Sequence, residues 1–489
     1  MKRKYLLLFS VLLLTSCQTV VVNSDSATEV PSDEPSPSET SIIESESPVE
    51  SDTEEASESE SESIESDSAS EEWKPEYSEI NSIEDYLSAE GDIPLINIHL
   101  DNNDFPVDRE NYVSGDLNIV EQPNEEHVIL PDTRMGLRLR GNSTFTAPKK
   151  AFRIKFDKKT SLFGLPKSKS WVLLANYFDK SNLRNYLAYQ LANKLSDDFQ
   201  PSFIFVDVKV NDEYLGLYLL TEQMQTGEGR VDIEGKVDSS GHSAFFVEME
   251  DAGRLMDEGG VEDQTFVRCT NNRTYDIKYP EGEELTSDQV SFVKSTINTA
   301  LSHMTQSDYA NYIDEESYMY NYLVQELFKN VDCGQSSVYY YWTPDDNKLH
   351  MGPVWDFDIG LDVVGIGNYI EDYTYATYHN ASLWAAQTNQ DYATLLTNSL
   401  FTSRLKQYYT ANRSSFVGTV DEFNKAVKLL ADAQARNVAK WTLPGDLDQW
   451  ISQRYQGEYE HFTTLEQHYT YLVDKLSGRI TLLDNNYKI

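Results

Sequence analysis

The sequence predicts an α+β protein with two folded lobes behind an unstructured leader, and three observations indicate this class. Short alternating or apolar runs fill about 92–250, whereas the periodicity from about 287 onward is mainly helical. Hydrophobic residues make up 39% of the 489 residues and aromatic residues 12%, enough for a substantial core. The folded part exceeds the roughly 250–300 residues at which one core stops growing. We therefore expect a β-rich N-lobe with one main helix over 78–235, and a mostly helical C-lobe with a helical C-terminal extension over 236–489.

The charge of the chain argues against one class of partner. There are 81 Asp and Glu against 40 Lys and Arg, so the formal net charge is −41. No basic surplus is present to release counterions from phosphates of a polyanion. We therefore expect no nucleic-acid partner.

Residues 1–17 have the pattern of an export signal. A basic head precedes the apolar run Tyr5–Thr15, which is shorter than the about 20 residues that a membrane helix needs. The ending Leu14-Thr-Ser-Cys17 resembles a bacterial lipobox, in which cleavage leaves the cysteine as the lipidated first residue. This predicts an exported lipoprotein, held by Cys17 on the outer face of the bacterial cytoplasmic membrane. The alternative is an ordinary secretory signal with an incidental cysteine.

Residues 18–77 have the composition of a disordered tether. This segment is rich in Ser and Glu and holds nineteen acidic residues against one basic residue, Lys74. Such a segment cannot bury enough apolar surface to offset its ordering entropy, and its like charges repel one another. A flexible coil of this length spans on the order of 45 Å, and charge repulsion extends it further.

The N-lobe pattern predicts strands and one helix. Leucines recur at every fourth residue from Leu183 to Leu195, which predicts a helix capped by Asp179 or Ser181. Asn211-Asp-Glu between two strand-like runs predicts a hairpin. The expected strands are Ile93–Leu100, Met135–Arg140, Ala151–Phe156, Ser170–Ala175, Ser202–Val210 and Tyr214–Leu220.

The C-lobe pattern predicts a helix, a loop and a hairpin in that order. The helix covers Asp314–Phe328, and its three leading acids suit the positive end of a helix dipole. The loop Lys329–Gln335 follows, and then Ser337–Trp342 and Lys348–Met351 form the hairpin. Further helices are expected over 380–485.

This order of parts indicates a possible carboxylate site. A hairpin returns the chain to where it began, so Asp332 should lie near Asp356 and Asp358, which follow the second strand. Converging carboxylates can bind Mg²⁺, which can bridge nucleotide phosphates. The alternative is that Asp332 caps a turn and that the other two acids are solvated at a strand end.

Other familiar site patterns are missing from the sequence. It contains no CxxC or HExxH spacing, no GxSxG elbow and no Walker-type GxxxxGK[ST]. Apart from Cys17, only Cys269 and Cys333 are present, and sequence does not decide whether they pair.

Several motifs occur in a fixed order between 90 and 365. They are Arg138-Leu-Arg-Gly-Asn-Ser-Thr144, Pro148-Lys-Lys-Ala-Phe-Arg-Ile-Lys-Phe156, Trp171-Val-Leu-Leu-Ala-Asn-Tyr-Phe-Asp179, Leu183-Arg-Asn185, Asn211–Glu222, Asn330-Val-Asp332 and Gly352-Pro-Val-Trp-Asp-Phe-Asp358. In their joint order they resemble the CotH kinase family, named for spore coat protein H. The resemblance implies a divergent bilobal protein-kinase fold that uses ATP and Mg²⁺.

The resemblance implies a role for individual residues. Asp332 matches the catalytic aspartate and Asp356 the metal-binding aspartate, with Asp358 as a second ligand. Arg140, Gly141, Asn142 and Ser143 would form a turn over the phosphates, where Gly141 allows close backbone approach. Lys149 or Lys150 would contact phosphate, with Lys155 as a competitor, and Glu222 would contact adenine or ribose. Either lysine could instead be a solvated strand-edge residue, and Glu222 a satisfied acid at a helix start.

Two departures from the kinase pattern stand out. Residues 180–195 contain no Glu to pair with the nucleotide lysine, so Asp179 or another element would have to substitute. Ser336 and Ser337 occupy the place of the asparagine that holds a second metal ion, and a hydroxyl is a poorer Mg²⁺ ligand.

The leading functional hypothesis is a cell-surface kinase that phosphorylates Ser or Thr of proteins. Its own tether is a candidate acceptor, because Ser32, Ser63 and Ser70 each have Glu two residues later. The alternative is a non-catalytic, pseudokinase-like binding or scaffolding module, for which the aromatic run Tyr339–Trp342 could provide contacts unless it packs in the core. A third reading, glycoside hydrolysis by paired acids, has only the surplus of acids and aromatics in its favour.

Overall fold

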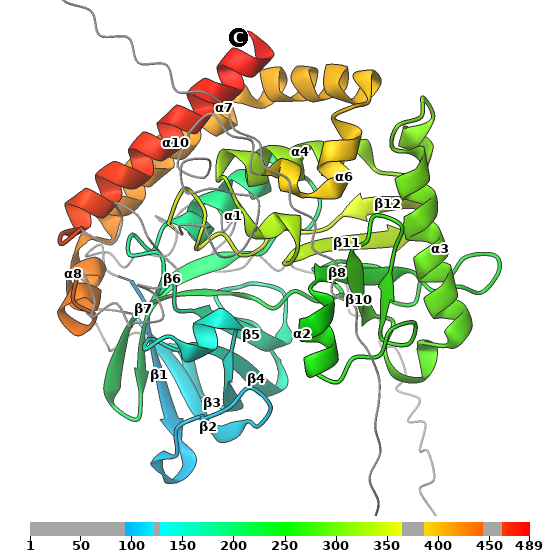
Figure 1. The fold of residues 1–489 in the computed structure, drawn as a ribbon. Helices are drawn as coiled ribbons and strands as arrows, with labels where there is room; N and C mark the ends of the chain where they lie inside the picture. Colours follow the sequence, from blue (N-terminus) through cyan, green and yellow to red (C-terminus); the bar gives the residue numbers. More distant parts are fainter. Residues whose placement is uncertain (1–92, 122–127, 364–385, 444–461) are drawn as a thin grey trace, which may run out of the picture. The chain divides into compact units, whose positions relative to one another are not determined.

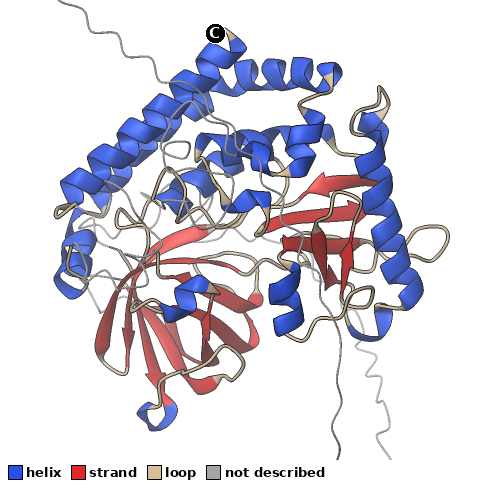
Figure 2. Cartoon of the chain, in the orientation of Figure 1, coloured by secondary structure: helices blue, strands red, loops and turns tan. Residues whose placement is uncertain are grey.

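The computed structural model describes residues 93–121, 128–363, 386–443 and 462–489 (Figure 1). Within these ranges it contains twelve strands and eight α-helices, which confirms the α+β class (Figure 2). The signal peptide, the lipidated Cys17 and the tether predicted over 1–77 lie outside the described residues.

The first seven strands form a closed barrel in the order β1-β2-β3-β4-β5-β7-β6. The barrel closes where β1 pairs in parallel with β6, whereas its other neighbours are antiparallel. Six of these strands overlap the runs predicted above, and β2 was not predicted. Their bounds are β1 Leu95–Leu100, β2 Val113–Val120, β3 Val128–Arg140, β4 Ala151–Thr160, β5 Ser168–Leu174, β6 Phe203–Val210 and β7 Glu213–Glu222.

The barrel is filled by every second residue of its strands. On β5, Trp171 and Leu173 pack in the barrel core, whereas Val172 and Leu174 pack in a second core outside it. Strands β6 and β7 alternate in the same way, so this side of the barrel is buried on both faces. The predicted hairpin at 211–213 joins these two strands, and Asn211 and Asp212 adopt the left-handed conformation that a tight hairpin turn requires.

Helix α1, Arg184–Leu195, packs in the core outside the barrel. Its predicted leucine stripe is confirmed, since Leu183, Leu187 and Leu191 are at most 1% exposed. Asp179 satisfies the helix start, because its carboxylate accepts the backbone N–H of Arg184 at 2.8 Å.

The second half of the folded chain contains a five-stranded sheet in the order β12-β11-β8-β10-β9. Only the β11–β12 hairpin was predicted, so the expectation of a mostly helical C-lobe overlooked three strands. The strands are β8 Phe245–Glu250, β9 Phe266–Arg268, β10 Thr274–Tyr279, β11 Val338–Thr343 and β12 Lys348–Met351; the helices of this part are α2 Ala252–Asp257, α3 Ser287–His303 and α4 Glu315–Leu327.

The C-terminal helices bind back to both halves of the fold. Helix α10 runs beside α7 (Figure 1), and α8 packs on β7 of the barrel. Asn437 of α8 accepts the backbone N–H of Leu217 at 3.1 Å, and the Trp441 indole donates to the Leu215 carbonyl at 2.8 Å. None of the helices in the described ranges is both long and apolar enough to cross a bilayer. The bounds are α6 Gln390–Leu395, α7 Ser399–Leu429, α8 Ala431–Lys440 and α10 Leu465–Tyr487.

Two questions left open by the sequence are answered inside the second core. Cys269 and Cys333 are both buried free thiols. Tyr339, Tyr340 and Trp342 of β11 are at most 6% exposed. These aromatic residues are therefore part of the core and not an exposed binding surface.

Candidate active site

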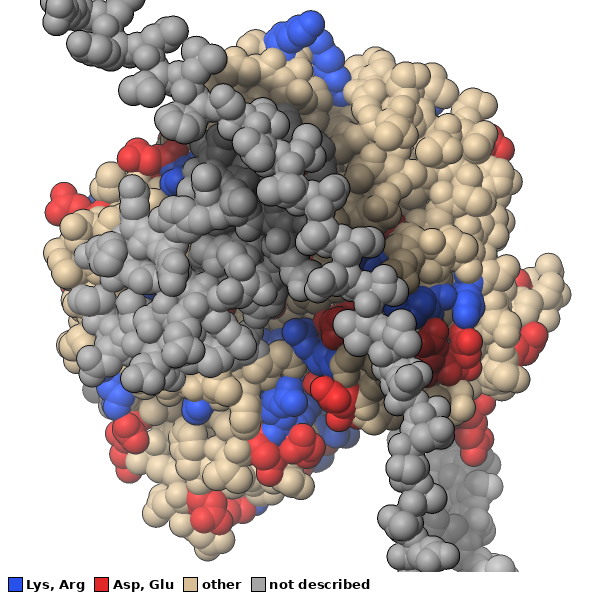
Figure 3. Space-filling model, viewed as in Figure 1, with Lys and Arg blue, Asp and Glu red and all other residues tan. Residues whose placement is uncertain are grey.

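A cavity of about 850 Å³ lies between the barrel and the second sheet. Strands β3 and β4 contribute one wall, and β8, β10 and α2 contribute the opposite wall. The loops that follow α4 and β12 complete the lining. Figure 3 shows basic and acidic side chains side by side in this part of the surface.

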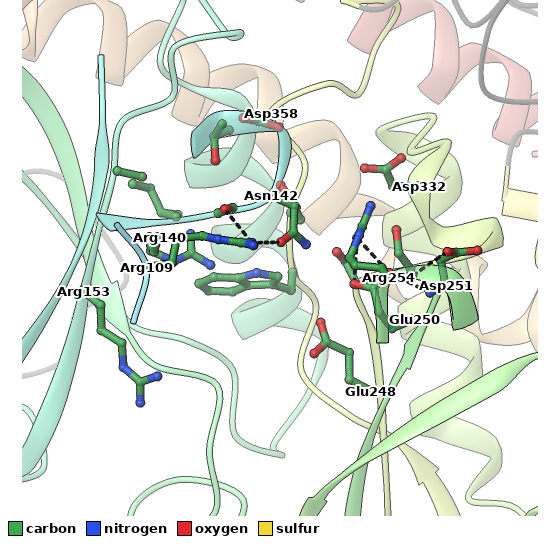
Figure 4. Close-up of a pocket in the computed structure, with 18 of the residues that line it drawn as sticks. Arg109, Arg140, Asn142, Arg153, Glu248, Glu250, Asp251, Arg254, Asp332 and Asp358 are labelled. Carbon is green, nitrogen blue, oxygen red and sulfur yellow. Dashed lines mark hydrogen bonds and ion pairs between the residues drawn. The ribbon is translucent and has the colours of Figure 1, made fainter. Parts of the chain in front are cut away.

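The loop after α4 brings Asp332 to the cavity. Asp314 caps the helix start by accepting the Ser317 N–H at 2.8 Å, and the chain leaves the helix at Phe328. The Asn330 side chain then accepts the backbone N–H of Asp332 at 3.2 Å, which fixes the loop. Asp332 lines the cavity beside α2 (Figure 4).

The segment after β12 brings Asp356 and Asp358 to the same cavity. Asn185 of α1 accepts the N–H of Phe357 at 2.7 Å, and Asn330 donates to the Asp356 carbonyl at 3.0 Å. Asn330 therefore joins the two acid-bearing loops. Asp356 has a φ of 65°, a conformation that is costly for a residue with a side chain and that clusters at functional sites.

Burial raises the pKa of all three carboxyl groups, and the charge of Asp356 raises the pKa of the other two further. Burial, followed by the charge of Asp356, raises the pKa of Asp332 to about 7. Burial and the Asp356 carboxylate raise the pKa of Asp358 well above its usual range, and burial also raises the pKa of Asp356. Crowded carboxylates of this kind are relieved by a cation, and their oxygens are the ligands that Mg²⁺ prefers. Asp356 and Asp358, whose side chains are hydrogen-bonded to each other, are therefore the residues that fit a magnesium ion.

A row of guanidinium groups forms the basic wall of the cavity. Arg138 and Arg140 lie two residues apart on β3 and both line the cavity. The alternate residues Leu137 and Leu139 lie on the other face of the strand, in the barrel core. Arg153 of β4 pairs with Arg138 across the sheet. Burial, followed by the nearby positive charges of the other two arginines, lowers the pKa of Arg153.

These arginines are suited to an anion, because guanidinium groups bind phosphate oxygens in a bidentate way. The sequence motif contained Arg138 and Arg153, but neither was assigned a role. The alternation of Arg and Leu along β3 is the signal that could have identified the row.

The predicted turn at 140–143 lies at the edge of this wall. Arg140, Gly141 and Asn142 line the cavity, and the backbone of Ser143 begins a 3-10 helix directly after it. Gly141 has a φ of 90°, which a residue with a side chain rarely adopts. Arg109 donates to the Asn142 side chain at 2.7 Å and so holds the turn (Figure 4).

The opposite wall is acidic and was not predicted. Glu248 and Glu250 lie two residues apart on β8 and both line the cavity. Arg254 of α2 donates to both oxygens of Glu250 at 2.8 Å, and it points toward Asp332 (Figure 4). Burial and the neighbouring Glu248 raise the pKa of Glu250 to about 7. Local sequence gave no sign of this wall, because β8 itself was missed.

Lys149, Lys150 and Glu222 are not brought to the cavity. Lys149 is 2% exposed and donates to the Leu217 carbonyl and to Asn437. Burial, followed by the charge of Lys180, lowers its pKa to about 7. The burial of Lys149 and its two acceptors do not fit the phosphate contact that the resemblance implied for this residue.

The other two residues have local partners as well. Lys150 donates to the Phe145 carbonyl at 2.9 Å. Glu222 forms a buried ion pair with Arg230 at 2.8 Å, and it accepts the Ser202 N–H. Its neighbour Gln223 lines the cavity instead.

The structure also shows where the residues lie that depart from the kinase pattern. Asp179 forms a fully buried ion pair with Arg184 at 2.6 Å, and Arg184 donates to the Gly360 carbonyl beyond Asp358. Asp179 therefore does not substitute for a helix glutamate that pairs with a lysine. Ser336 and Ser337 both line the cavity.

Comparison with known families identifies the class of this protein. A family model described as CotH kinase protein matches residues 137–479, which covers the barrel from the end of β3 onward, the second sheet and most of the C-terminal helices. The chain therefore belongs to the CotH kinase family. No curated protein matches the chain.

Proposed function

We propose that this chain is an ATP-dependent protein kinase that transfers the γ-phosphoryl group to Ser or Thr hydroxyls of proteins in the presence of Mg²⁺. The observation that carries the proposal is one cavity that is lined by a basic wall of arginines and by three buried carboxyl groups with raised pKa values. Its volume of about 850 Å³ lies within the range of ligand pockets. We further propose that the barrel and the second half correspond to the two lobes of a divergent protein-kinase fold.

Each group in the cavity has a defined task in this proposal. Asp356 and Asp358 would hold the magnesium ion, which neutralises phosphate charge when it is bound. Arg138, Arg140 and the backbone of the turn at 140–143 bind phosphate oxygens. Asp332 orients the acceptor hydroxyl and receives its proton, the role that a carboxylate in hydrogen-bond reach of the hydroxyl can perform.

The test is phosphate incorporation into a dephosphorylated acidic protein with MgATP. We expect the unaltered protein to label the acceptor and Asp332→Ala and Asp356→Ala to lose about 100-fold or more of the rate, since each removes a group needed in the transition state. Asp432→Ala, an exposed acid on α8, is the matched control and should stay fully active.

Two outcomes would count against the proposal. Equal labelling by all the proteins would remove the roles given to Asp332 and Asp356. ATP binding without labelling in any of them would favour the alternative, a pseudokinase-like surface binding or scaffolding module.

We also propose that the kinase is exported and anchored through a lipid on Cys17, with the tether at 18–77 as one substrate. The acid-directed serines Ser32, Ser63 and Ser70 support the second part, because tethering makes the encounter intramolecular. Incubation of the full chain with MgATP should add phosphate to these serines, as read by mass spectrometry. A tether whose mass does not change in a chain that labels other proteins would contradict this substrate alone.

A further inference from the structure

A second group of potential metal ligands lies outside the cavity. Asp198 is in the loop after α1, Asp314 is at the start of α4, and His350 is on β12. Each offers one ligand atom, and the three atoms lie within 4.8 Å of one another. None of the three residues lines the candidate active site.

His350 carries a buried nitrogen atom without a hydrogen-bond partner. The residue is 9% exposed, and its ring stacks on Tyr341 with the centroids 4.5 Å apart. Nε2 lies 3.0 Å from an oxygen of Asp346, whereas Nδ1 has no hydrogen-bond partner among the described residues. Nδ1 faces Asp314, whose nearest carboxylate oxygen is 3.8 Å away.

This arrangement is the one that prepares an imidazole to bind a metal ion. In the tautomer whose Nε2–H donates to Asp346, the lone pair of His350 is on Nδ1, the nitrogen that faces Asp314. A carboxylate behind the imidazole fixes the tautomer and raises the basicity of the ligand nitrogen. A buried lone pair that finds no donor is otherwise unfavourable.

The spacing and charge of the cluster also suit a cation. Two ligands at about 2.0–2.2 Å from one ion lie up to about 4 Å apart, so the 3.8 Å between His350 and Asp314 requires little movement. Asp198 is exposed, so its carboxylate can rotate inward. Negative charge is in excess here, because the acids Asp197 and Glu316 lie one and two residues from the ligands Asp198 and Asp314.

We propose that Asp198, Asp314 and His350 form a structural site for one divalent transition cation of the Mn²⁺ or Zn²⁺ class, with water completing the coordination. One nitrogen and two oxygen ligands suit these ions better than Ca²⁺. The ion would join the loop after α1 to α4 and β12. Those two elements lead directly to Asp332 and Asp356, and Gln200 of the same loop accepts the Val354 N–H at 3.0 Å. The ion thereby stiffens the frame of the candidate active site.

Electron paramagnetic resonance of the full chain with Mn²⁺, without nucleotide, tests the site directly. We expect one bound Mn²⁺ to show coupling to an imidazole nitrogen. The described lining of the candidate active site contains no histidine, so Mn²⁺ bound there would not give this coupling. Asp346→Ala should weaken the affinity by about 10–100-fold, since it removes the carboxylate acceptor behind His350.

Two neighbouring exposed acids provide a matched pair. Asp198→Asn should reduce the nitrogen-coupled Mn²⁺ affinity at least about tenfold and abolish the rise in Tm that Mn²⁺ causes. Asp197→Asn, with the same change of charge one residue away, should keep both. Both variants change an exposed residue, so they remain informative if His350→Gln fails to fold. The absence of nitrogen coupling at saturating Mn²⁺, or equal affinity in the two variants, would overturn the site.

Discussion

At the scale of single residues, the arginine row is the part of the site with the clearest consequence for ligand binding. Arg140 lies at the end of this row, and its guanidinium also sits over the Trp355 ring, 5.5 Å from the centroid. We predict that Arg140→Gln weakens ATP binding about tenfold or more, because a charged bond to phosphate is lost. Calorimetry with MgATP gives the affinity. Lys155→Gln removes a positive charge from the adjacent strand, outside the cavity lining, and should leave the affinity unchanged; equal losses would contradict the prediction.

A second prediction at this scale concerns His468 of α10, which is 1% exposed. Burial, followed by the charges of Arg184 and Lys180, lowers its pKa to about 3. Since an unfolded histidine titrates near 6.5, below that pH only the unfolded chain takes up this proton. The contribution of His468 to the free energy of unfolding is therefore complete above pH 6.5 and is lost as the pH falls toward 3.

Denaturant unfolding measures this effect against His468→Gln. Between pH 7.5 and 5.5 the unaltered protein should lose about 1.4 kcal/mol more than the variant, which has no such titration. Parallel curves for the two proteins would show that His468 is protonated without penalty in the folded state.

At the scale of elements, α1 positions the loop that carries Asp356 and Asp358. Asn185 accepts the Phe357 N–H, and its own amide donates to Asn176 at 3.0 Å. We predict that Asn185→Ala lowers kcat at least about tenfold with little change in KM for ATP, because the acids shift while the arginine wall stays in place. The change should cost about 1–3 kcal/mol of stability, since a buried N–H loses its partner. Lys194→Ala at the far end of α1 is the control, and a pure rise in KM would contradict the positioning role.

Local patterns predicted those elements whose sequences carry a clear period or turn signal. The alternation in β4, β5 and β6, the leucine stripe of α1, and the hairpin turn at 211–213 were all recognised correctly. Strand β8 escaped because the charged Glu248 and Glu250 interrupt its apolar residues, and β9 is only three residues long. The convergence of Asp332 with Asp356 could be inferred, because one short hairpin separates them. The alternation along β3 could have placed Arg138 and Arg140 on one face, but the position of Arg153 beside them depends on the pairing of β3 with β4, which sequence alone did not reveal.

At the scale of the whole folded part, the C-terminal helices hold the barrel through a few buried polar contacts. Asn437 satisfies both the Leu217 N–H and the Lys149 amine. We predict that Asn437→Leu lowers the free energy of unfolding by about 1–3 kcal/mol, because it leaves the buried Leu217 N–H without an acceptor and removes one of the two acceptors of Lys149. Denaturant unfolding followed by fluorescence measures the loss. Asp432→Asn, exposed on the same helix, should change the stability by less than about 0.5 kcal/mol. A loss as small as this in Asn437→Leu would show that the contact of α8 with the barrel contributes little to stability.

Barrel closure and the docking of α8 were beyond the sequence argument for the same reason. Both depend on partners that are distant along the chain, such as the parallel pairing of β1 with β6. No period within a short window encodes such a pairing. The role of Lys149 was misjudged for the same reason. Its buried amine donates to Asn437, which lies 288 residues away along the chain, so the sequence around Lys149 does not indicate this contact.

The attachment of α8 to β7 also bears on the order in which the protein matures. The backbone N–H of Leu217 lacks its acceptor until Asn437 has been synthesised, 220 residues later. The surface of β7 that α8 covers is therefore exposed until that point. Domains generally complete their folding as units while the chain emerges from its N-terminus. Here a strand of the barrel depends on one of the later helices to be made, so a prematurely terminated chain would expose the part of β7 that α8 covers.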